Sequence, residues 1–416
     1  MAQTLQATRG SLPGVQASER RSRAKNARAR AHSRRLSPFL LVLTGWTALA
    51  HVPVAMASAM AASALGLPWP WAIGAALAVA LVLPFHRRML AMMPDRPRPR
   101  WQLALIEAPY FAHWCAASFA LAWTTAAAMA WVVGRIALGH APFGLNQAAL
   151  WGYLTGALVA AWGVWVRRKW VRVRRLDVPV RGLDPVFHGY KIVQLSDLHL
   201  GSFNPEETAL RWVRLANSLD ADLIAVTGDL ITSGEDYYAS VQSVIRELRA
   251  RDGVVVSPGN HDYFGDAEAL FDHVRASGAR LLRNEGFTLR RGGASLQVAG
   301  VDDTWTRRAD VHAALAKRPD GAPTVLLAHD PDLFPIAAAR GVQLVLSGHT
   351  HGGQIAVPFL ARWINLSKLS HRYHLGLYRD GPSHLFVSGG LGTTGPPIRV
   401  GSAPEICVIR LVASHA

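Results

Sequence analysis

Polar segments that could bind metal ions follow five apolar runs in the second half of the chain. Each run has the length and the β-branched residues of a buried strand, and each is followed by Asp, His or Asn, which are common ligands of divalent cations. The segments are Ser196–His199, Thr227–Asp229, Pro258–Asp262, Ala328–His329 and Ser347–His351. Five such ends in one chain argue against coincidence.

These segments provide seven candidate metal ligands: Asp197, His199, Asp229, Asn260, His329, His349 and His351. In an extended chain Asp197 and His199 would project to one side, as would His349 and His351, because side chains alternate with a period of two. Asp229 stands between neutral imidazoles and is the natural carboxylate to bridge two cations. The set predicts a pair of divalent ions, Mn, Zn or Fe, roughly 3.5–4 Å apart. Glycines 228, 259 and 348 would let the backbone approach the ions closely.

The apolar runs alternate with amphipathic stretches, which predicts an α/β domain. The expected strands are Lys191–Leu195, Leu223–Val226, Val254–Ser257, Thr324–Leu327 and Gln343–Leu346, and the expected helices are Glu206–Ser218, Tyr238–Ala250 and Asp332–Ala339. Such alternation favours βαβ units and a largely parallel sheet. Sites in these sheets collect beyond the carboxyl ends of strands, where the polar segments fall.

The order of these blocks resembles the calcineurin-like metallophosphoesterase superfamily. The blocks are Asp-x-His, Gly-Asp, Gly-Asn-His-Asp, a lone His and Gly-His-Thr-His, all within residues 190–355. Further segments are similar to its YkuE-like, membrane-associated bacterial branch: Gly300–Asp303, Gly352–Gln354, Ser388–Gly392 and Pro404–Ile406. The resemblance covers residues 190–412 and implies a fold of two stacked mixed β-sheets flanked by helices.

The resemblance also implies roles for individual residues. One metal would be held by Asp197, His199, Asp229 and His351, and the other by Asp229, Asn260, His329 and His349. A hydroxide bridging the metals would attack the phosphorus, His261 would protonate the leaving oxygen, and Asp262 would orient His261. Two weaker candidates come from the residues alone: Arg399, beside a Gly-rich turn, could meet a substrate phosphate or be a surface arginine, and Tyr263 could line the cleft.

Two related enzyme groups are disfavoured by the second block, which reads Gly228-Asp229-Leu230-Ile231-Thr232. The tyrosine ligand of purple acid phosphatases is missing from it. So is the Asp-Arg-Gly extension of Ser/Thr protein phosphatases.

The first part of the chain is predicted to cross a membrane four times. Residues 36–85 contain no Asp, Glu, Lys or Arg, enough for two spans of about 20 residues, divided at Leu67–Pro70. Further spans are expected at about Pro109–Val133 and Asn146–Val166. The expected organisation is a basic, disordered arm at 1–35, an all-α membrane region at 36–166, a basic linker at 167–189 and the phosphoesterase domain at 190–412.

Lysine and arginine in the short loops predict the orientation of these spans. The arm carries nine, the loop at 86–108 five and the segment at 167–175 six, whereas Arg135 is alone on the opposite side. This asymmetry predicts a multi-pass protein of the inner membrane with its catalytic domain in the cytoplasm. Ser33-Arg34-Arg35 offers an alternative, because it looks like a twin-arginine export signal.

The basic charge does not predict nucleic-acid binding. Residues 1–175 hold 21 Lys and Arg against three acids, so the net charge of +16 belongs to the membrane region and the remainder is nearly neutral. The two cysteines exclude a disulfide framework and are expected to be buried.

The resulting prediction is a membrane-anchored metallophosphoesterase, with the bilayer and a phosphodiester or phosphomonoester as partners. The four spans favour a lipid or lipid-linked substrate. A catalytically silent scaffold with this fold is the alternative, although the seven ligands are intact. A transporter is disfavoured, because the spans lack the charges that mark ion pathways.

Overall fold

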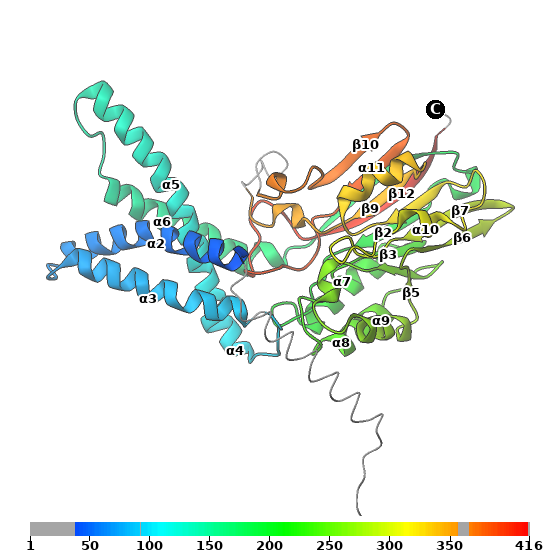
Figure 1. Cartoon of the computed structure of the whole chain (residues 1–416), viewed down its shortest axis with the longest axis horizontal. Coiled ribbons are helices and arrows are strands. Elements are labelled where there is room, and N and C mark those ends of the chain that lie inside the picture. The colour runs from blue at the N-terminus through cyan, green and yellow to red at the C-terminus, as the bar shows by residue number, and fades with distance from the viewer. Residues whose placement is uncertain (1–37, 92, 357–365, 415–416) are drawn as a thin grey trace, which may run out of the picture. The chain divides into compact units, whose positions relative to one another are not determined.

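The computed structural model describes residues 38–91, 93–356 and 366–414. One compact unit ends at Leu49 and a second begins at Ala50 and holds most of the chain. The predicted arm at 1–35 and its arginine pair lie outside the described residues. The arrangement of the elements named below is shown in Figure 1.

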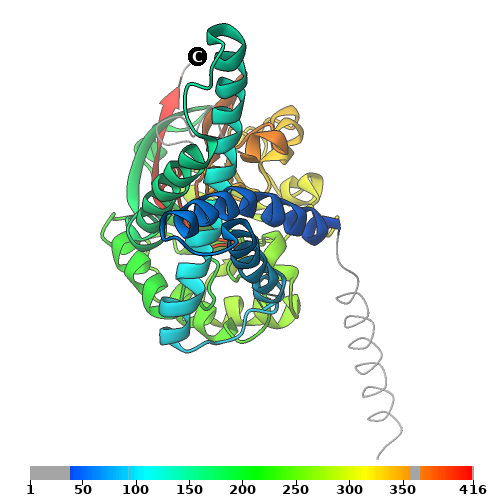
Figure 2. The ribbon, with the colours of Figure 1, turned by 90° about the vertical axis from the view of Figure 1, so that its left-hand side faces the viewer.

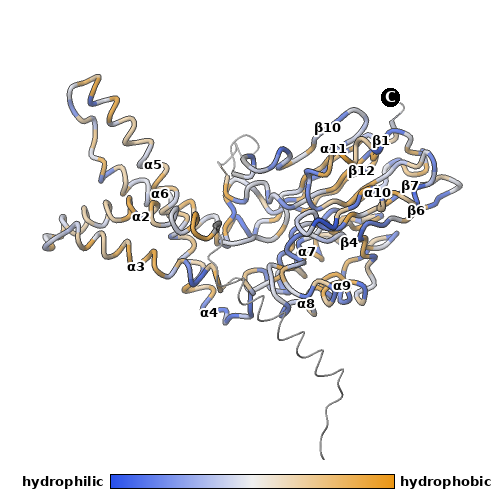
Figure 3. Tube along the Cα trace, in the orientation of Figure 1, coloured by the Kyte–Doolittle hydropathy of each residue, from blue (hydrophilic) through white to orange (hydrophobic). Residues whose placement is uncertain are grey.

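Among the described residues, four helices are long and apolar enough to cross a membrane, as many as the sequence predicted. They are α2 (Pro38–Ala64), α3 (Pro70–Leu90), α5 (Ala108–Leu138) and α6 (Leu145–Trp165). Orange and white colours, which mark apolar and intermediate residues, predominate along them in Figure 3. The third helical run is longer than predicted, because the short helix α4 (Arg100–Gln102) and the π-helical turn η1 (Leu103–Glu107) lead directly into α5.

Small residues let α5 and α6 pack closely. A Cβ on Gly156 would lie 2.9 Å from the Ala116 carbonyl oxygen, and one on Gly152 would lie 2.6 Å from the Trp123 ring. Small residues at such contacts bring helix backbones together within a bilayer.

Twelve strands form two mixed six-stranded sheets in the described chain, as the family resemblance implied. The first sheet has the order β1-β12-β2-β3-β4-β5 and the second β10-β11-β9-β8-β7-β6. The strands of the first are β1 (Arg172–Arg181), β12 (Glu405–Ser414), β2 (Lys191–Leu195), β3 (Leu223–Thr227), β4 (Val254–Ser257) and β5 (Arg280–Leu281). Those of the second are β10 (Gly376–Asp380), β11 (Ser383–Val387), β9 (Leu344–Ser347), β8 (Thr324–Leu327), β7 (Ala294–Gly300) and β6 (Glu285–Arg291).

Helices cover the outer face of each sheet. The remaining α-helices are α7 (Glu206–Asn217), α8 (Tyr238–Arg246), α9 (Ala267–Ala276), α10 (Val311–Leu315) and α11 (Phe334–Ala339). The short 3₁₀ turns are η2 (Arg167–Lys169), η3 (Pro185–Phe187), η4 (Asn260–Tyr263), η5 (Pro331–Leu333), η6 (His351–Gly353) and η7 (Leu366–Leu369). One core joins the first sheet to α7, α8 and α9, and another joins the second sheet to α10 and α11.

A third core lies between the sheets and holds them face to face. It contains Ile192 and Leu223 from the first sheet and Val298 and Val325 from the second, all 0–1% exposed. The predicted strands before the polar segments are therefore divided between two sheets, β2, β3 and β4 in one and β8 and β9 in the other. Their carboxyl ends meet at one edge of the sandwich.

The segment expected to be a basic linker contains β1. This strand pairs in parallel with β12, the C-terminal strand coloured red in Figures 1 and 2. Val178 and Val180 are buried, whereas Asp177 and Arg181, which flank them, are exposed. Because charged residues protect an edge strand from unwanted pairing, the basic composition that suggested a linker also suits a strand at the edge of this sheet.

Candidate metal centre

Six of the seven predicted ligands gather in two groups that share one carboxylate. Asp197, His199, Asp229 and His351 each offer a ligand atom within 4.8 Å of the others, as do Asp229, His329 and His349. We call these the first and the second group. The resemblance implied this division, with Asp229 common to both.

In the first group two imidazoles face two carboxylates. The Nε2 atoms of His199 and His351 are 3.0 Å apart. His199 Nε2 lies 3.4 Å from Asp229 Oδ2, and His351 Nε2 lies 3.4 Å from Asp197 Oδ1. All four side chains are buried. Nitrogen and oxygen atoms thus converge on one point.

In the second group His329 faces the same carboxylate oxygen. Its Nδ1 donates to the Thr227 carbonyl at 2.7 Å, and its Nε2 lies 3.2 Å from Asp229 Oδ2. The His349 ring packs against the His329 ring with centroids 5.1 Å apart. Asn260 is 5% exposed and its Oδ1 has no hydrogen-bond partner among the described residues.

The backbone at these ligands is not extended, so the predicted alternation is wrong for His349 and His351, although Asp197 and His199 do share the first group. Asp197, His199, Asp229, His349 and His351 have φ values between 44° and 70°, in the left-handed region. As a result His349 and His351 point into different groups. Non-glycine residues seldom adopt this conformation, and such strain concentrates at functional sites.

Gly228 brings the backbone of the second polar segment close to two neighbouring segments of the site. Its φ is 76°, and a Cβ there would lie 2.7 Å from both the Gly259 nitrogen and His329 Nδ1. Only glycine fits between these two segments without displacing a ligand.

The donor set fits divalent cations. Asp197 Oδ2 and Asn260 Oδ1 are buried without a hydrogen-bond partner among the described residues. Burial lowers the pKa of His199 to about 3, and burial with the nearby His329 lowers that of His349 to about 4, so both rings are neutral and able to ligate. Burial also lowers the pKa of His329, but the Asp229 carboxylate outweighs it and raises the value to about 10. The position beside Asp229 therefore favours a positive charge.

We expect metal affinity to rise with pH. A cation at the second group displaces the His329 proton, which the pKa of about 10 retains at neutral pH. Affinity should therefore increase by about tenfold per pH unit between pH 7 and 9 and level off above about 10. Calorimetric titration of metal-free protein with Mn²⁺ in buffers of different ionisation enthalpy would measure the released proton. Affinity that does not change from pH 7 to 9 would contradict this assignment.

His261 lies beside the groups, but its partner differs from the one expected. Its Nδ1 is 2.6 Å from the carbonyl oxygen of Thr232, to which it donates, and its ring lies 4.6 Å from that of His199. The backbone nitrogen of His261 donates to Asp229 Oδ1 at 2.9 Å. The Thr232 carbonyl thus occupies the orienting position that we predicted for Asp262.

Asp262 instead supports the backbone around Asp229. Its carboxylate accepts hydrogen bonds from the nitrogens of Gly259, Asp229 and Leu230 at 2.8, 3.1 and 2.7 Å, and its side chain is fully buried. A carboxylate with three backbone donors holds the second and third polar segments together.

Replacing Asp262 with alanine should therefore destabilise the domain. Three buried N–H groups would lose their acceptor, at about 1–3 kcal/mol each, so we expect a loss of at least about 3 kcal/mol and a clearly lower melting temperature. Thermal unfolding followed by circular dichroism would measure it. Asp272→Ala, at a side chain that is 76% exposed, is the control and should melt like the wild type. Equal melting of both variants would refute the assignment.

The two predicted substrate contacts have other partners. The Tyr263 hydroxyl donates to Asp302, which also pairs with Arg283 at 3.0 Å. Arg399 is fully buried, and its guanidinium donates to the carbonyls of Gly392 and Gly389 at 2.6 and 2.7 Å and lies 3.3 Å from His351 Nδ1. Arg399 therefore stands behind a candidate ligand and is not a surface arginine.

Two further residues belong to the surroundings of the site and were not predicted. Thr232 contributes a carbonyl, for which the sequence contains no signal. The His371 ring lies 5.0 Å from that of His349, and it forms a third group of possible ligands with Asp330 and Asp332. Asp332 is exposed, and exposed acidic groups commonly occur without an ion.

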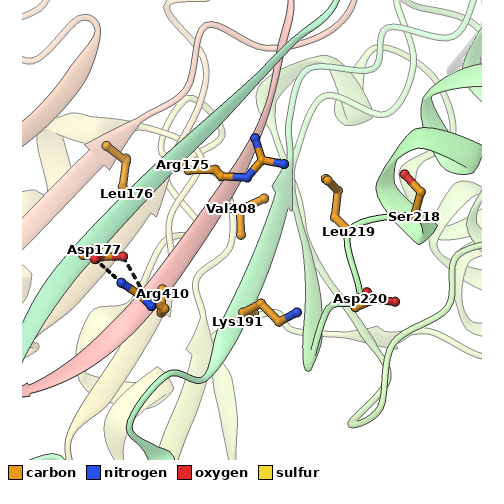
Figure 4. A pocket seen from close by; sticks show the side chains of 9 residues that line it. All are labelled: Arg175, Leu176, Asp177, Lys191, Ser218, Leu219, Asp220, Val408 and Arg410. Carbon is orange, nitrogen blue, oxygen red and sulfur yellow. Dashed lines mark hydrogen bonds and ion pairs between the residues drawn. The ribbon is translucent and has the colours of Figure 1, made fainter.

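A hollow of about 660 Å³ lies beside the amino end of β2 (Figure 4). It is lined by Lys191, the first residue of β2, and by Asp220, shortly before β3, and the ion pair Asp177–Arg410 borders it. Because the metal groups follow the carboxyl ends of the same strands, this hollow is a separate feature.

Comparison with known proteins agrees with this site. The family model of calcineurin-like phosphoesterases matches residues 190–353. The metallophosphoesterase YkuE of Bacillus subtilis is 34% identical over 233 residues, 55% of this chain and 81% of that protein. A Helicobacter pylori metallophosphoesterase is 34% identical over 240 residues, 56% of this chain and 62% of that one. A bovine transmembrane protein with metallophosphoesterase domain is 33% identical over 263 residues, 58% of this chain and 57% of that one.

Proposed function

Because this chain belongs to the calcineurin-like metallophosphoesterase family, we propose that it is a membrane-anchored enzyme that hydrolyses a phosphodiester or phosphomonoester with two divalent metal ions. The observation that carries the proposal is the position of Asp229, whose carboxylate is shared by two groups of ligands, all of them buried except the half-buried His349. A single structural ion would need one group, whereas two groups about one carboxylate suit a dinuclear hydrolytic centre.

The seven ligands would hold the ions as the groups divide them, with Asn260 completing the second. Two bound cations would polarise the phosphoryl oxygens and lower the pKa of a water molecule. His261 supplies the remaining chemistry, because its Nδ1 proton is held by the Thr232 carbonyl and its Nε2 is left to exchange a proton with the leaving oxygen. The Asp262 carboxylate accepts from the backbone nitrogens of Asp229 and Gly259 and so holds Asp229 and the adjacent Asn260 in position.

Apolar features beside His261 support a lipid or lipid-linked substrate. The Phe264 ring contacts the His261 ring at 4.6 Å, and Trp305, 68% exposed, lies 6.5 Å beyond Phe264. A leaving group protonated by His261 would meet these rings, which suits an apolar group. The four long apolar helices would hold such a site close to a bilayer.

We place the catalytic domain on the cytoplasmic side of the membrane. The loop after α3 and the segment after α6 both contact the phosphoesterase domain, so they belong to one side, and both are rich in arginine. The positive-inside tendency assigns that side to the cytoplasm. A C-terminal alkaline phosphatase fusion should be inactive and a fluorescent protein fusion bright; the reverse pattern would place the domain outside.

The test of the proposed activity is hydrolysis of bis(p-nitrophenyl) phosphate by the full chain in detergent. We expect turnover with added Mn²⁺, its loss after chelation and its return when the metal is restored. A protein that binds two ions but hydrolyses neither this diester, p-nitrophenyl phosphate nor any phosphoester of a bacterial lipid extract would favour the alternative of a catalytically silent scaffold.

A further inference from the structure

The loop between α3 and α4 is tied to the segment that carries His199. Asp95 is 3% exposed, and its carboxylate accepts from the Ser202 backbone nitrogen at 2.8 Å and lies 2.6 Å from the Ser202 hydroxyl. Arg98 pairs with the same carboxylate at 3.1 Å. Ser202 follows His199 by three residues, so a carboxylate from the membrane region anchors the turn after this ligand.

The same loop reaches the segment that orients His261. The Asp95 nitrogen donates to the Ser233 hydroxyl at 3.0 Å. The adjacent Thr232 uses its carbonyl to accept from His261 and its hydroxyl to donate to the His199 carbonyl at 3.1 Å. Asp95 therefore bonds to Ser233, which is adjacent to Thr232, and to Ser202, which is three residues after His199.

The last turn of α6 approaches the site from another direction. The backbone nitrogen of Arg399 donates to the Gly163 carbonyl at 3.3 Å. A Cβ on Gly163 would lie 2.8 Å from Ile398 Cγ1 and 2.9 Å from both the Arg399 oxygen and Val400 Cγ2. The helix thus packs directly on the segment Ile398–Val400, whose arginine lies beside His351.

These contacts converge on one of the two groups of ligands. Asp95 supports the segment of His199, and Gly163 supports that of Arg399 and His351, and both histidines belong to the first group. The second group is held differently, by the Thr227 carbonyl on His329. Within the described residues, the membrane region therefore contacts the frame of the first group, whereas the contacts that hold the second group come from the phosphoesterase domain.

We propose that Asp95 and Gly163 are positioning residues for the first metal ion, so that the membrane helices complete one half of the dinuclear centre. Mutation of a residue that supports a metal ligand typically lowers metal affinity by about 10–100-fold. A change in the packing of the helices would then alter the occupancy of one ion while the other stays bound. This inference rests on the proposed dinuclear site.

The test is Mn²⁺ titration of the metal-free full chain in two backgrounds that isolate each ion. His349→Ala leaves the first group, and His351→Ala leaves the second. We expect Asp95→Ala and Gly163→Ala to weaken the remaining ion at least about tenfold in the His349→Ala background and less than about threefold in the His351→Ala background. Asp95→Asn keeps the size of the side chain and one acceptor, so it should have an intermediate effect. This variant keeps the test decisive if the alanine variant folds poorly.

Two matched controls separate this effect from damage to the helices. Glu107 is a buried acid that pairs with Arg88 at 2.5 Å, and Gly156 approaches α5 as closely as Gly163 approaches the domain. Glu107→Ala and Gly156→Ala should leave both affinities within about threefold of the parent. Equal weakening in the two backgrounds, or controls that match Asp95→Ala and Gly163→Ala, would overturn the inference. Failure of the unmodified chain to bind two ions would instead refute the dinuclear site itself.

Discussion

Asp229→Asn should abolish hydrolysis and reduce bound metal from two ions to one or none. Asp229 is the carboxylate that both groups share, and its Oδ2 lies 3.4 Å from His199 Nε2 and 3.2 Å from His329 Nε2. Burial alone would raise its pKa, but the neighbouring His329 and His261 hold the pKa well below its usual value, so it remains a carboxylate. Because a metal ion supplies several kcal/mol to the transition state, we expect turnover to fall by at least about 10³-fold.

Asparagine is the informative replacement, because its carboxamide oxygen can still accept a hydrogen bond from the backbone nitrogen of His261. Asp222→Asn is the matched control: this buried aspartate precedes β3, at the other end of the strand from Asp229, and pairs with Arg251 at 2.6 Å. It should bind two ions and retain turnover. Metal content measured by mass spectrometry would decide the matter, and two ions in Asp229→Asn would exclude the bridging role.

His261→Ala should keep both ions and lose turnover in a manner that depends on the leaving group. General acid catalysis contributes about 10²–10⁴-fold, and we expect this loss for an alkyl phosphodiester, whose leaving oxygen requires a proton. A p-nitrophenolate leaving group needs little protonation, so its hydrolysis should fall much less. The ratio of the two rates therefore reports the role of His261 separately from any general damage.

His273→Ala is the control for this comparison. His273 lies on α9 with its Nδ1 2.7 Å from Gln242 Oε1, in contact with neither group of ligands. Its variant should hydrolyse both substrates at wild-type rates. Equal losses for the alkyl and aryl substrates in His261→Ala would show that His261 binds the phosphate or the frame and does not protonate the leaving group.

The strands that lead into the site could be predicted within one residue, because short β-branched runs ended by Gly, Asp and His give a clear local pattern. The candidate ligands were inferred from the residues that directly follow these strands, and six of the seven gather in the two groups. The two-sheet arrangement came from the resemblance, since local pattern alone suggested a largely parallel sheet. The strand β1 was missed because its arginines resemble the basic flank of a membrane helix.

The surroundings of the ligands were less accessible to sequence reasoning. The role of Thr232 rests on a backbone carbonyl, which every residue possesses. Arg399 has the composition of a surface residue, and only tertiary packing shows that carbonyl groups enclose it. Asp95 is the only acidic residue between Arg87 and Arg100, a segment with five arginines, which is a weak sign of a specific role. Its partner Ser202 is 107 residues away, and the sequence does not indicate that pairing.

Anomalous diffraction from crystals of the full chain soaked in Mn²⁺ would test the central claim most directly. We predict two peaks roughly 3.5–4 Å apart, one on each side of the Asp229 carboxylate, with His199 and His351 at one ion and His329, His349 and Asn260 at the other. A single peak, or two peaks that do not share Asp229, would contradict the account.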